Sequence, residues 1–361
     1  MYRILKFLPE ALIFLAVFIS CDMPGMKKYL LIAGLSLILL FLSRKKRWSA
    51  DALCCVALPA AVYLFLGTFQ TMICGNVYSS AIKIVVFWVI PLIFAFALYL
   101  FYGNDMKRIT DMEFLCACMA YTVINWRFLV KTWNVESTFA FVFGAFFIYY
   151  VYQKRWTFCG LSALFIYFSD KRIVVMAILP AVAILGILWL FRQDRRLAAI
   201  FWGLLMAAVG GYVWLIRSGA LQYFCRGIGI NTNGRVKMYS QITEWFDELP
   251  LLFGNGIGVV EKLLEAWKIP AFANLHNDLL KFYIELGAIG LLIFLLSYGI
   301  VFFWVEKKFG KEKMSLFLAL AVYTMLLYAT DNVSIYILYL IPVYSILFTV
   351  LLPERAKEEK R

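Results

Sequence analysis

Residues 81–102 read AIKIVVFWVIPLIFAFALYLFY, an apolar run in which Lys83 is the only charged side chain. An α-helix of this length spans about 33 Å, enough to cross the ~30 Å hydrocarbon core of a bilayer. Hydrophobic residues make up 64% of the 361-residue chain, whereas charged residues make up only 16%. Soluble domains carry about 25% charged residues. The composition therefore excludes a soluble enzyme, a soluble nucleic-acid-binding protein and a disordered chain.

Eleven further apolar segments predict an all-α polytopic membrane protein with about 12 transmembrane helices. The twelve segments lie near residues 4–21, 28–43, 51–70, 81–102, 112–130, 137–153, 156–169, 173–191, 197–216, 279–304, 314–329 and 333–352. Two segments are short and one is borderline, so the expected number of helices runs from 10 to 12. We expect helices 1–9 in residues 1–216, a large external loop at 217–275, helices 10–12 in 276–352 and a tail at 353–361.

The distribution of basic residues predicts the orientation. With the N-terminus in the cytoplasm, 21 of the 35 Lys and Arg residues lie inside and 14 lie outside, in agreement with the positive-inside rule. Both termini and the tail are then cytoplasmic, and the long loop is external. The net charge of +13 is an orientation signal and predicts no nucleic-acid partner.

Several motifs of cofactor and metal chemistry are missing from the sequence. The chain has eight cysteines without a CxxC pair and a single histidine, which predicts no zinc site. It has no Asp-x-Asp pair, no nucleotide-binding Gly-x-x-x-x-Gly-Lys-[Ser/Thr] loop and no Gly-x-Ser-x-Gly elbow. We therefore predict neither a metal nor a cofactor. Residues 254–258 (GNGIG) lack a following lysine and are predicted to form a flexible turn.

Ionisable side chains at membrane depth are the candidates for function. His276 lies at the outer mouth of a membrane helix, where it either handles the proton of a hydroxyl or only caps the helix together with Asn274 or Asn277. Glu285 lies about 13 Å deeper on nearly the opposite face of that helix. It either pairs with Lys281 or takes part in function.

Two arginines on the outer side could bind phosphate, because guanidinium groups remain charged and bind phosphate oxygens in pairs. Arg172 opens a membrane segment, so anchoring at lipid headgroups explains it equally well. Arg235 opens an amphipathic stretch of the external loop, where a solvated face is the alternative. The functional interpretation gains weight because Arg172, Arg235 and His276 all fall on one side of the membrane.

Motifs in the second half of the chain resemble those of a known family. They are Gly234-Arg235, the GNGIG run at 254–258, His276-Asn277-Asp278-Leu279-Leu280 and Glu285-Leu286-Gly287-Ala288-Ile289-Gly290. The Ser-Asp-Lys-Arg turn at 169–172 and the Thr-Asp-Asn turn at 330–332 are similar to elements of the same proteins. With these motifs the chain resembles the O-antigen ligase and polymerase superfamily, mainly over residues 165–335.

The resemblance implies a GT-C-like glycosyltransferase architecture in a bacterial cytoplasmic (inner) membrane, with the active site on the outer face. The implied reaction is a metal-independent, inverting transfer of a glycan from undecaprenyl diphosphate. By this resemblance Arg172 and Arg235, assisted by Lys171, bind the diphosphate, and Glu285 joins the substrate-binding residues. His276 orients or deprotonates the acceptor hydroxyl, and Asn277 supports it.

The resemblance leaves the acceptor open. The forms of Lys171-Arg172 and Asp331-Asn332 are more similar to capsule and exopolysaccharide polymerases, which add the glycan to the next lipid-linked repeat unit. A ligase, which transfers the glycan to lipid A-core, is the first alternative, and a lipid-linked glycan flippase is the second. Expected partners are the lipid-linked donor and acceptor, membrane lipid contacting Trp245, Phe246 and Trp267, and a chain-length regulator protein.

Overall fold

The computed structural model describes residues 8–21, 27–43, 49–75, 79–229, 235, 238, 239, 241, 242, 252–266 and 275–352. Within these ranges all regular secondary structure is helical. The helices are α2 (Leu8–Cys21), α3 (Lys27–Leu42), α4 (Ala50–Cys74), α5 (Ser79–Tyr102), η1 (Gly103–Asp105), α6 (Met106–Thr132), α7 (Phe139–Tyr152), α8 (Trp156–Phe168), α9 (Arg172–Leu190), α10 (Arg195–Arg217), α11 (Ala220–Gly227), α13 (Val259–Ala266), α14 (Asp278–Phe309), α15 (Lys311–Tyr328), η2 (Val333–Ile335) and α16 (Ile337–Val350).

A helix lies at each of the twelve predicted apolar segments. By length and composition, five helical stretches of the described chain can cross a membrane: Ala50–Cys74, Ser79–Thr132, Arg172–Leu190, Arg195–Arg217 and Asp278–Phe309. The prediction of an all-α membrane protein is thereby confirmed. The number of spans, the GT-C-like architecture and the orientation remain predictions.

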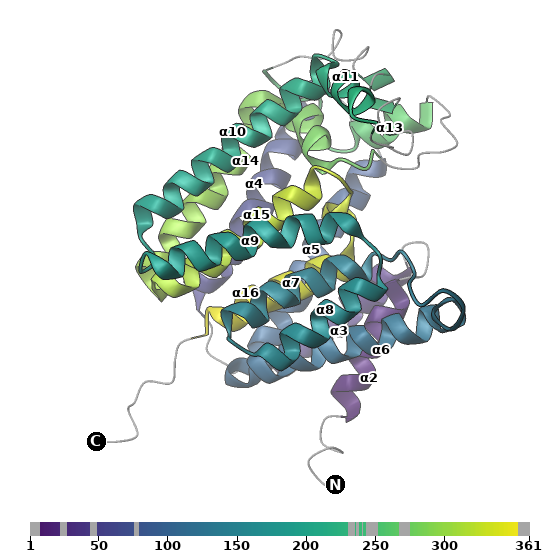
Figure 1. Ribbon diagram of the computed structural model, residues 1–361, viewed down its shortest axis with the longest axis vertical. Coiled ribbons are helices and arrows are strands. Elements are labelled where there is room, and N and C mark those ends of the chain that lie inside the picture. The colour runs from purple at the N-terminus through teal and green to yellow at the C-terminus, as the bar shows by residue number, and fades with distance from the viewer. Residues whose placement is uncertain are drawn as a thin grey trace.

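The long helices pack side by side in one bundle (Figure 1). The most extensive helix contacts are between α4 and α14, α9 and α15, α5 and α16, and α3 and α5. Aromatic side chains fill the core: the ring of Tyr63 lies 4.9 Å from those of Trp88 and Phe282. Large apolar side chains such as Leu30, Phe65 and Trp189 are exposed on the outside of the bundle. Such an apolar outer surface suits a helix bundle that is surrounded by lipid.

Helix α14 is broken in its first third, at Gly287. Gly287 has φ 73° and ψ 177°, a backbone conformation open essentially to glycine alone. The carbonyls of Ile284 and Glu285, next to the break, accept hydrogen bonds from the amides of Asn255 (3.1 Å) and Gly256 (3.0 Å). The glycine-rich segment 254–258 therefore supplies hydrogen-bond donors to two carbonyls beside the break in the helix.

This arrangement corrects the prediction of a flexible turn at 254–258. Gly254, Gly256, Ile257 and Gly258 are buried, and a Cβ on Gly254 would collide with the carbonyl of Glu285. The glycines are needed so that two backbones can approach closely. A sequence pattern shows glycine content, but it does not show whether another backbone lies against the segment.

Short helices of the predicted external loop gather at one end of the bundle. Helix α11 packs on α10 and α13 packs on α14, and both short helices appear at the top of Figure 1. Trp245, Phe246 and Trp267 lie outside the described residues, as does the tail 353–361. Their contact with lipid and the position of the tail therefore remain predictions.

Candidate functional site

The site is organised around the turn between α15 and α16. The amide of Asp331 donates to the carbonyl of Leu327 (2.9 Å), which ends α15. The Asp331 side chain then accepts the amide of Asn332 through Oδ1 (2.8 Å). An aspartate that binds the following amide stabilises a tight turn. Its carboxylate, only 4% exposed, is fixed by the backbone of its own turn.

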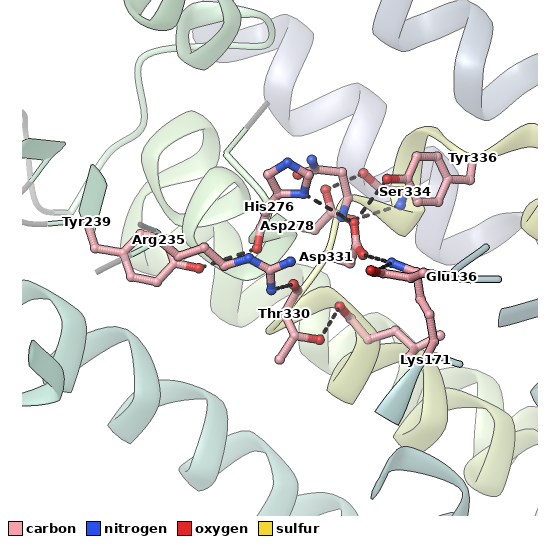
Figure 2. A network of polar contacts seen from close by, with 12 residues as sticks. Glu136, Lys171, Arg235, Tyr239, His276, Asp278, Thr330, Asp331, Ser334 and Tyr336 are labelled. Atoms are coloured by element: carbon pink, nitrogen blue, oxygen red, sulfur yellow. Dashed lines mark hydrogen bonds and ion pairs between the residues drawn. The ribbon is translucent and has the colours of Figure 1, made fainter. Parts of the chain in front are cut away.

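Three side chains reach the Asp331 carboxylate, two of them from distant parts of the chain. Figure 2 shows His276, Lys171 and Tyr336 converging on it. Nδ1 of His276 lies 3.5 Å from Oδ1, and the Tyr336 hydroxyl donates to the same oxygen at 3.0 Å. The ammonium of Lys171 donates to Oδ2 at 3.2 Å. Asp331 thus joins the predicted catalytic residue to one of the predicted substrate-binding residues.

The charges around Asp331 keep it ionised. Burial alone would raise the pKa of its carboxyl group, but the hydrogen bond with His276 and the positive charge of Lys171 lower it. Further hydrogen bonds from Asn332 and Tyr336 act in the same direction, so the pKa lies well below its ordinary value. A carboxylate that is ionised at neutral pH therefore faces the His276 ring.

His276 is held in an unusual backbone conformation just before α14. Its φ of 51° lies in the left-handed region, which non-glycine residues rarely adopt. The Tyr239 hydroxyl donates to the His276 carbonyl at 3.3 Å, and Asn277 begins the helix by accepting the Leu280 amide at 3.0 Å. The imidazole is 31% exposed, so it remains accessible at the edge of the bundle.

Arg235 contacts the same turn at Thr330, the residue before Asp331. Its guanidinium donates to the carbonyl of Thr330 at 2.7 Å (Figure 2). This bond uses one of the five N–H donors of an arginine. Arg235 and His276 therefore contact adjacent residues of one turn, Thr330 and Asp331, although most of the predicted external loop lies between them in the sequence.

Lys171 lies between two carboxylates. Besides Asp331 it pairs with Glu136 (3.1 Å), whose side chain is 72% exposed, and it lies over the ring of Phe141. Arg172, the next residue, is exposed at the first position of α9. The two basic residues of this turn thus differ: Lys171 is mostly buried in the network, whereas Arg172 faces outward.

Glu285 lies in a separate buried cluster. Its Oε2 accepts the Tyr63 hydroxyl (2.5 Å) and its Oε1 accepts the Gly258 amide (2.8 Å). The sequence analysis left a pairing with Lys281 as one of two possibilities, but Lys281 forms its ion pair with Glu261 of α13 (2.5 Å). Glu285 is fully buried, and the structure brings it to the glycine segment rather than to His276.

The sequence analysis missed four polar residues near the site. Asp331 was noted only as part of a turn, and Tyr212, Tyr239 and Tyr336 carried no signal because the chain contains 21 tyrosines. Asp278 was quoted within the His-Asn motif, and the structure shows it accepting both the amide and the hydroxyl of Ser334 at 2.7 Å. This contact fastens the start of α14 to η2, beside Asp331.

No three side chains of His, Cys, Asp or Glu gather as a metal-ligand group in the described ranges. Two cationic side chains contact the turn at 330–331: Lys171 at Asp331 and Arg235 at Thr330. Positive charges of this kind favour binding of anionic groups such as phosphate.

Comparison with known proteins identifies the part of the chain that carries these residues. A family model described as O-antigen ligase matches residues 157–295, from α8 to the middle of α14. The matched stretch includes Lys171, Arg172, Arg235, His276, Asn277 and Glu285, whereas the turn at 330–332 lies beyond it. Curated proteins gave no match. The match confirms the resemblance seen in the motifs: residues 157–295 are similar to the O-antigen ligase family.

Proposed function

We propose that the protein is a polysaccharide polymerase of the cytoplasmic membrane. It transfers a growing glycan from undecaprenyl diphosphate to the next lipid-linked repeat unit by a metal-independent, inverting reaction. One observation carries the proposal: the turn at Thr330 and Asp331 gathers His276, Lys171 and Arg235 in a partly exposed position. The transfer requires a base for the acceptor and a cation for the diphosphate, and His276 and Arg235 supply these two residue types.

His276 acts on the acceptor hydroxyl in this proposal. With Nδ1 directed at the ionised Asp331, the neutral ring carries its proton on Nδ1 and uses Nε2 as the acceptor. The hydroxyl proton passes to Nε2 as its oxygen attacks the anomeric carbon of the donor. The carboxylate stabilises the imidazolium that forms. The 3.5 Å separation is long for a hydrogen bond, and such contacts commonly shorten when substrate binds.

Arg235 and Arg172 act on the leaving group. When the glycosidic bond breaks, the electron pair stays on the diphosphate oxygen, and fixed positive charges stabilise it. Arg235 is held at the turn by Thr330, and Arg172 is exposed at the start of α9. We assign Lys171 to the orientation of Asp331, because its ammonium already lies between two carboxylates.

A ligase is the second candidate function, and the description of the matching family model favours it. Polymerase and ligase share the donor and the leaving group and differ in the acceptor. The preference for a polymerase rests on the similarity of Asp331-Asn332 and Lys171-Arg172 to the corresponding turns of capsule polymerases. A flippase is a third candidate, because transporters also contain discontinuous helices such as α14.

The test is deletion of the gene in its host, followed by electrophoresis of the surface glycan. The deletion strain is complemented with the parent protein, with His276→Ala and with the control Tyr223→Phe, a change at an exposed residue of α11. For a polymerase, the deletion leaves single-repeat glycan, and long chains return with the parent and the control but not with His276→Ala.

Two other outcomes of the same experiment contradict the proposal. Long chains that still form but remain on the lipid carrier identify a ligase. Repeat units that never reach the outer face identify a flippase. Purified protein in lipid nanodiscs gives an independent measurement, since a polymerase lengthens a lipid-linked repeat unit without added lipid A-core.

A further inference from the structure

A tyrosine of α10 connects the two chain segments that carry His276 and Asp331. The Tyr212 hydroxyl accepts a hydrogen bond from the Asn277 side-chain amide at 2.9 Å. The same hydroxyl donates to the carbonyl of Ala329 at 2.6 Å. Asn277 directly follows His276, and Ala329 lies two residues before Asp331. One phenol oxygen thus fastens the start of α14 to the end of α15.

The contact between His276 and Asp331 depends on this backbone arrangement. At 3.5 Å it lies at the limit of a hydrogen bond, and such a bond weakens steeply with further separation. The left-handed φ of His276 is held by neighbouring contacts, among them the Tyr239 hydroxyl on its carbonyl. A shift of a few tenths of an ångström at either segment would separate the ring from the carboxylate.

Asn277 links Tyr212 to the backbone of His276, the residue before it. It is fully buried: its Oδ1 accepts the Leu280 amide at 3.0 Å, while its Nδ2 donates to Tyr212. Buried amides that lose a partner rearrange or pull in water. If Tyr212 loses its hydroxyl, the Asn277 amide loses an acceptor and the Ala329 carbonyl loses a donor, on both sides of the His276–Asp331 pair.

We propose that Tyr212 is a positioning residue that sets the separation between His276 and Asp331. The inference rests on the proposed transfer reaction, in which that separation determines how well the ring accepts a proton. Tyr212 acts through Asn277 and Ala329, and no contact of its own with substrate is needed. Its removal lowers the rate of the chemical step far more than it changes donor binding by the arginines.

The experiment measures steady-state transfer from a lipid-linked oligosaccharide by purified protein in nanodiscs. Tyr212→Phe is expected to lower kcat by roughly 10- to 100-fold, the effect of losing one or two buried hydrogen bonds, with KM for the donor changed less than about twofold. Asn277→Asp keeps the helix-capping oxygen but removes the donor to Tyr212, so it is expected to lower kcat similarly. Tyr223→Phe is the control.

Combined variants separate positioning from a general structural effect. Because Tyr212 works through His276, Tyr212→Phe added to His276→Ala is expected to cause no further loss. The inference is wrong if Tyr212→Phe has the same kcat as the parent. It is also wrong if adding Tyr212→Phe to His276→Ala lowers kcat further, by the same factor as in the single variant. Parent protein without transfer activity contradicts the proposed function itself, so the two failures are distinguishable.

Discussion

His276 and Asp331 meet at 3.5 Å although 55 positions separate them in the sequence. His276 precedes α14 and Asp331 follows α15, so the antiparallel return of these two helices brings the residues to the same end of the bundle. Each lies at a helix boundary and is fixed by backbone contacts: Asp331 by the Asn332 amide, and His276 by the Asn277 cap beside it. The pair is therefore a product of helix packing.

The charge of Asp331 is expected to be needed for catalysis. Asp331→Asn keeps the shape of the side chain but removes the negative charge that faces His276. A charge-assisted hydrogen bond contributes about 1.5–3 kcal/mol, so kcat should fall roughly 10- to 150-fold. Asp105→Asn, at an exposed position beyond α5, is the matched control. If kcat is unchanged in Asp331→Asn, the negative charge of Asp331 is not needed for the reaction.

Binding of the lipid diphosphate is expected to depend on Arg235. Arg235→Ala should weaken binding of undecaprenyl diphosphate by roughly 10- to 100-fold, the size of one charge-assisted contact. Arg235→Lys keeps the charge but lacks the guanidinium fork, so it should restore binding only in part. The measurement is titration of nanodisc-embedded protein, with exposed Arg226→Ala as the control. Equal affinity in Arg235→Ala and the parent would exclude Arg235 from the diphosphate site.

The stability that Asp331 contributes is expected to vary with pH only in acid. Its pKa is depressed in the folded protein, so its contribution is complete above its unfolded pKa of about 3.9 and is lost as the pH falls through the lower folded value. The difference in Tm between the parent and Asp331→Asn should therefore stay constant from about pH 5 to pH 8 and shrink below about pH 4. A difference that changes near neutral pH would contradict the assignment of a fully ionised carboxylate.

The break in α14 is expected to require glycine. Gly287→Ala places a Cβ against the backbone of Phe253 at a φ of 73°, and the backbone conformation alone costs about 1–3 kcal/mol. The Tm in detergent should fall, and activity should fall with it as the glycine segment is displaced. Gly211→Ala in α10, where a Cβ meets no atom within 4 Å, should leave Tm unchanged or raise it slightly. Equal Tm values for the two variants would show that α14 tolerates a regular helical turn at Gly287.

The sequence predicted the positions of the helices well because apolar length is a property of each segment alone. Residues 81–102, for example, fall within α5 and its boundaries follow from hydropathy. The motif residues Arg235 and His276 were also recognised, and the structure attaches both to one turn. What these residues do in the reaction remains a prediction.

Contacts between distant segments could not be predicted in the same way. Asp331 has no local feature that distinguishes it from an ordinary turn residue, and its partner Lys171 is 160 positions away. Tyr63 and Glu285 are 222 positions apart, so the partner of Glu285 was sought one helical turn away, at Lys281. Spacing along one helix indicates which residues can meet on it, but it carries no information about the neighbouring helices.

The broken helix α14 also has a consequence for how the protein is inserted into the membrane. Two of its carbonyl groups receive their hydrogen bonds from Asn255 and Gly256, which precede the helix in the chain. Within a lipid environment, backbone groups without partners are strongly unfavourable. We therefore expect the broken form of α14 to be stable only once residues 252–258 lie against it, so that this part of the helix takes its final shape after insertion, when the two segments pack together.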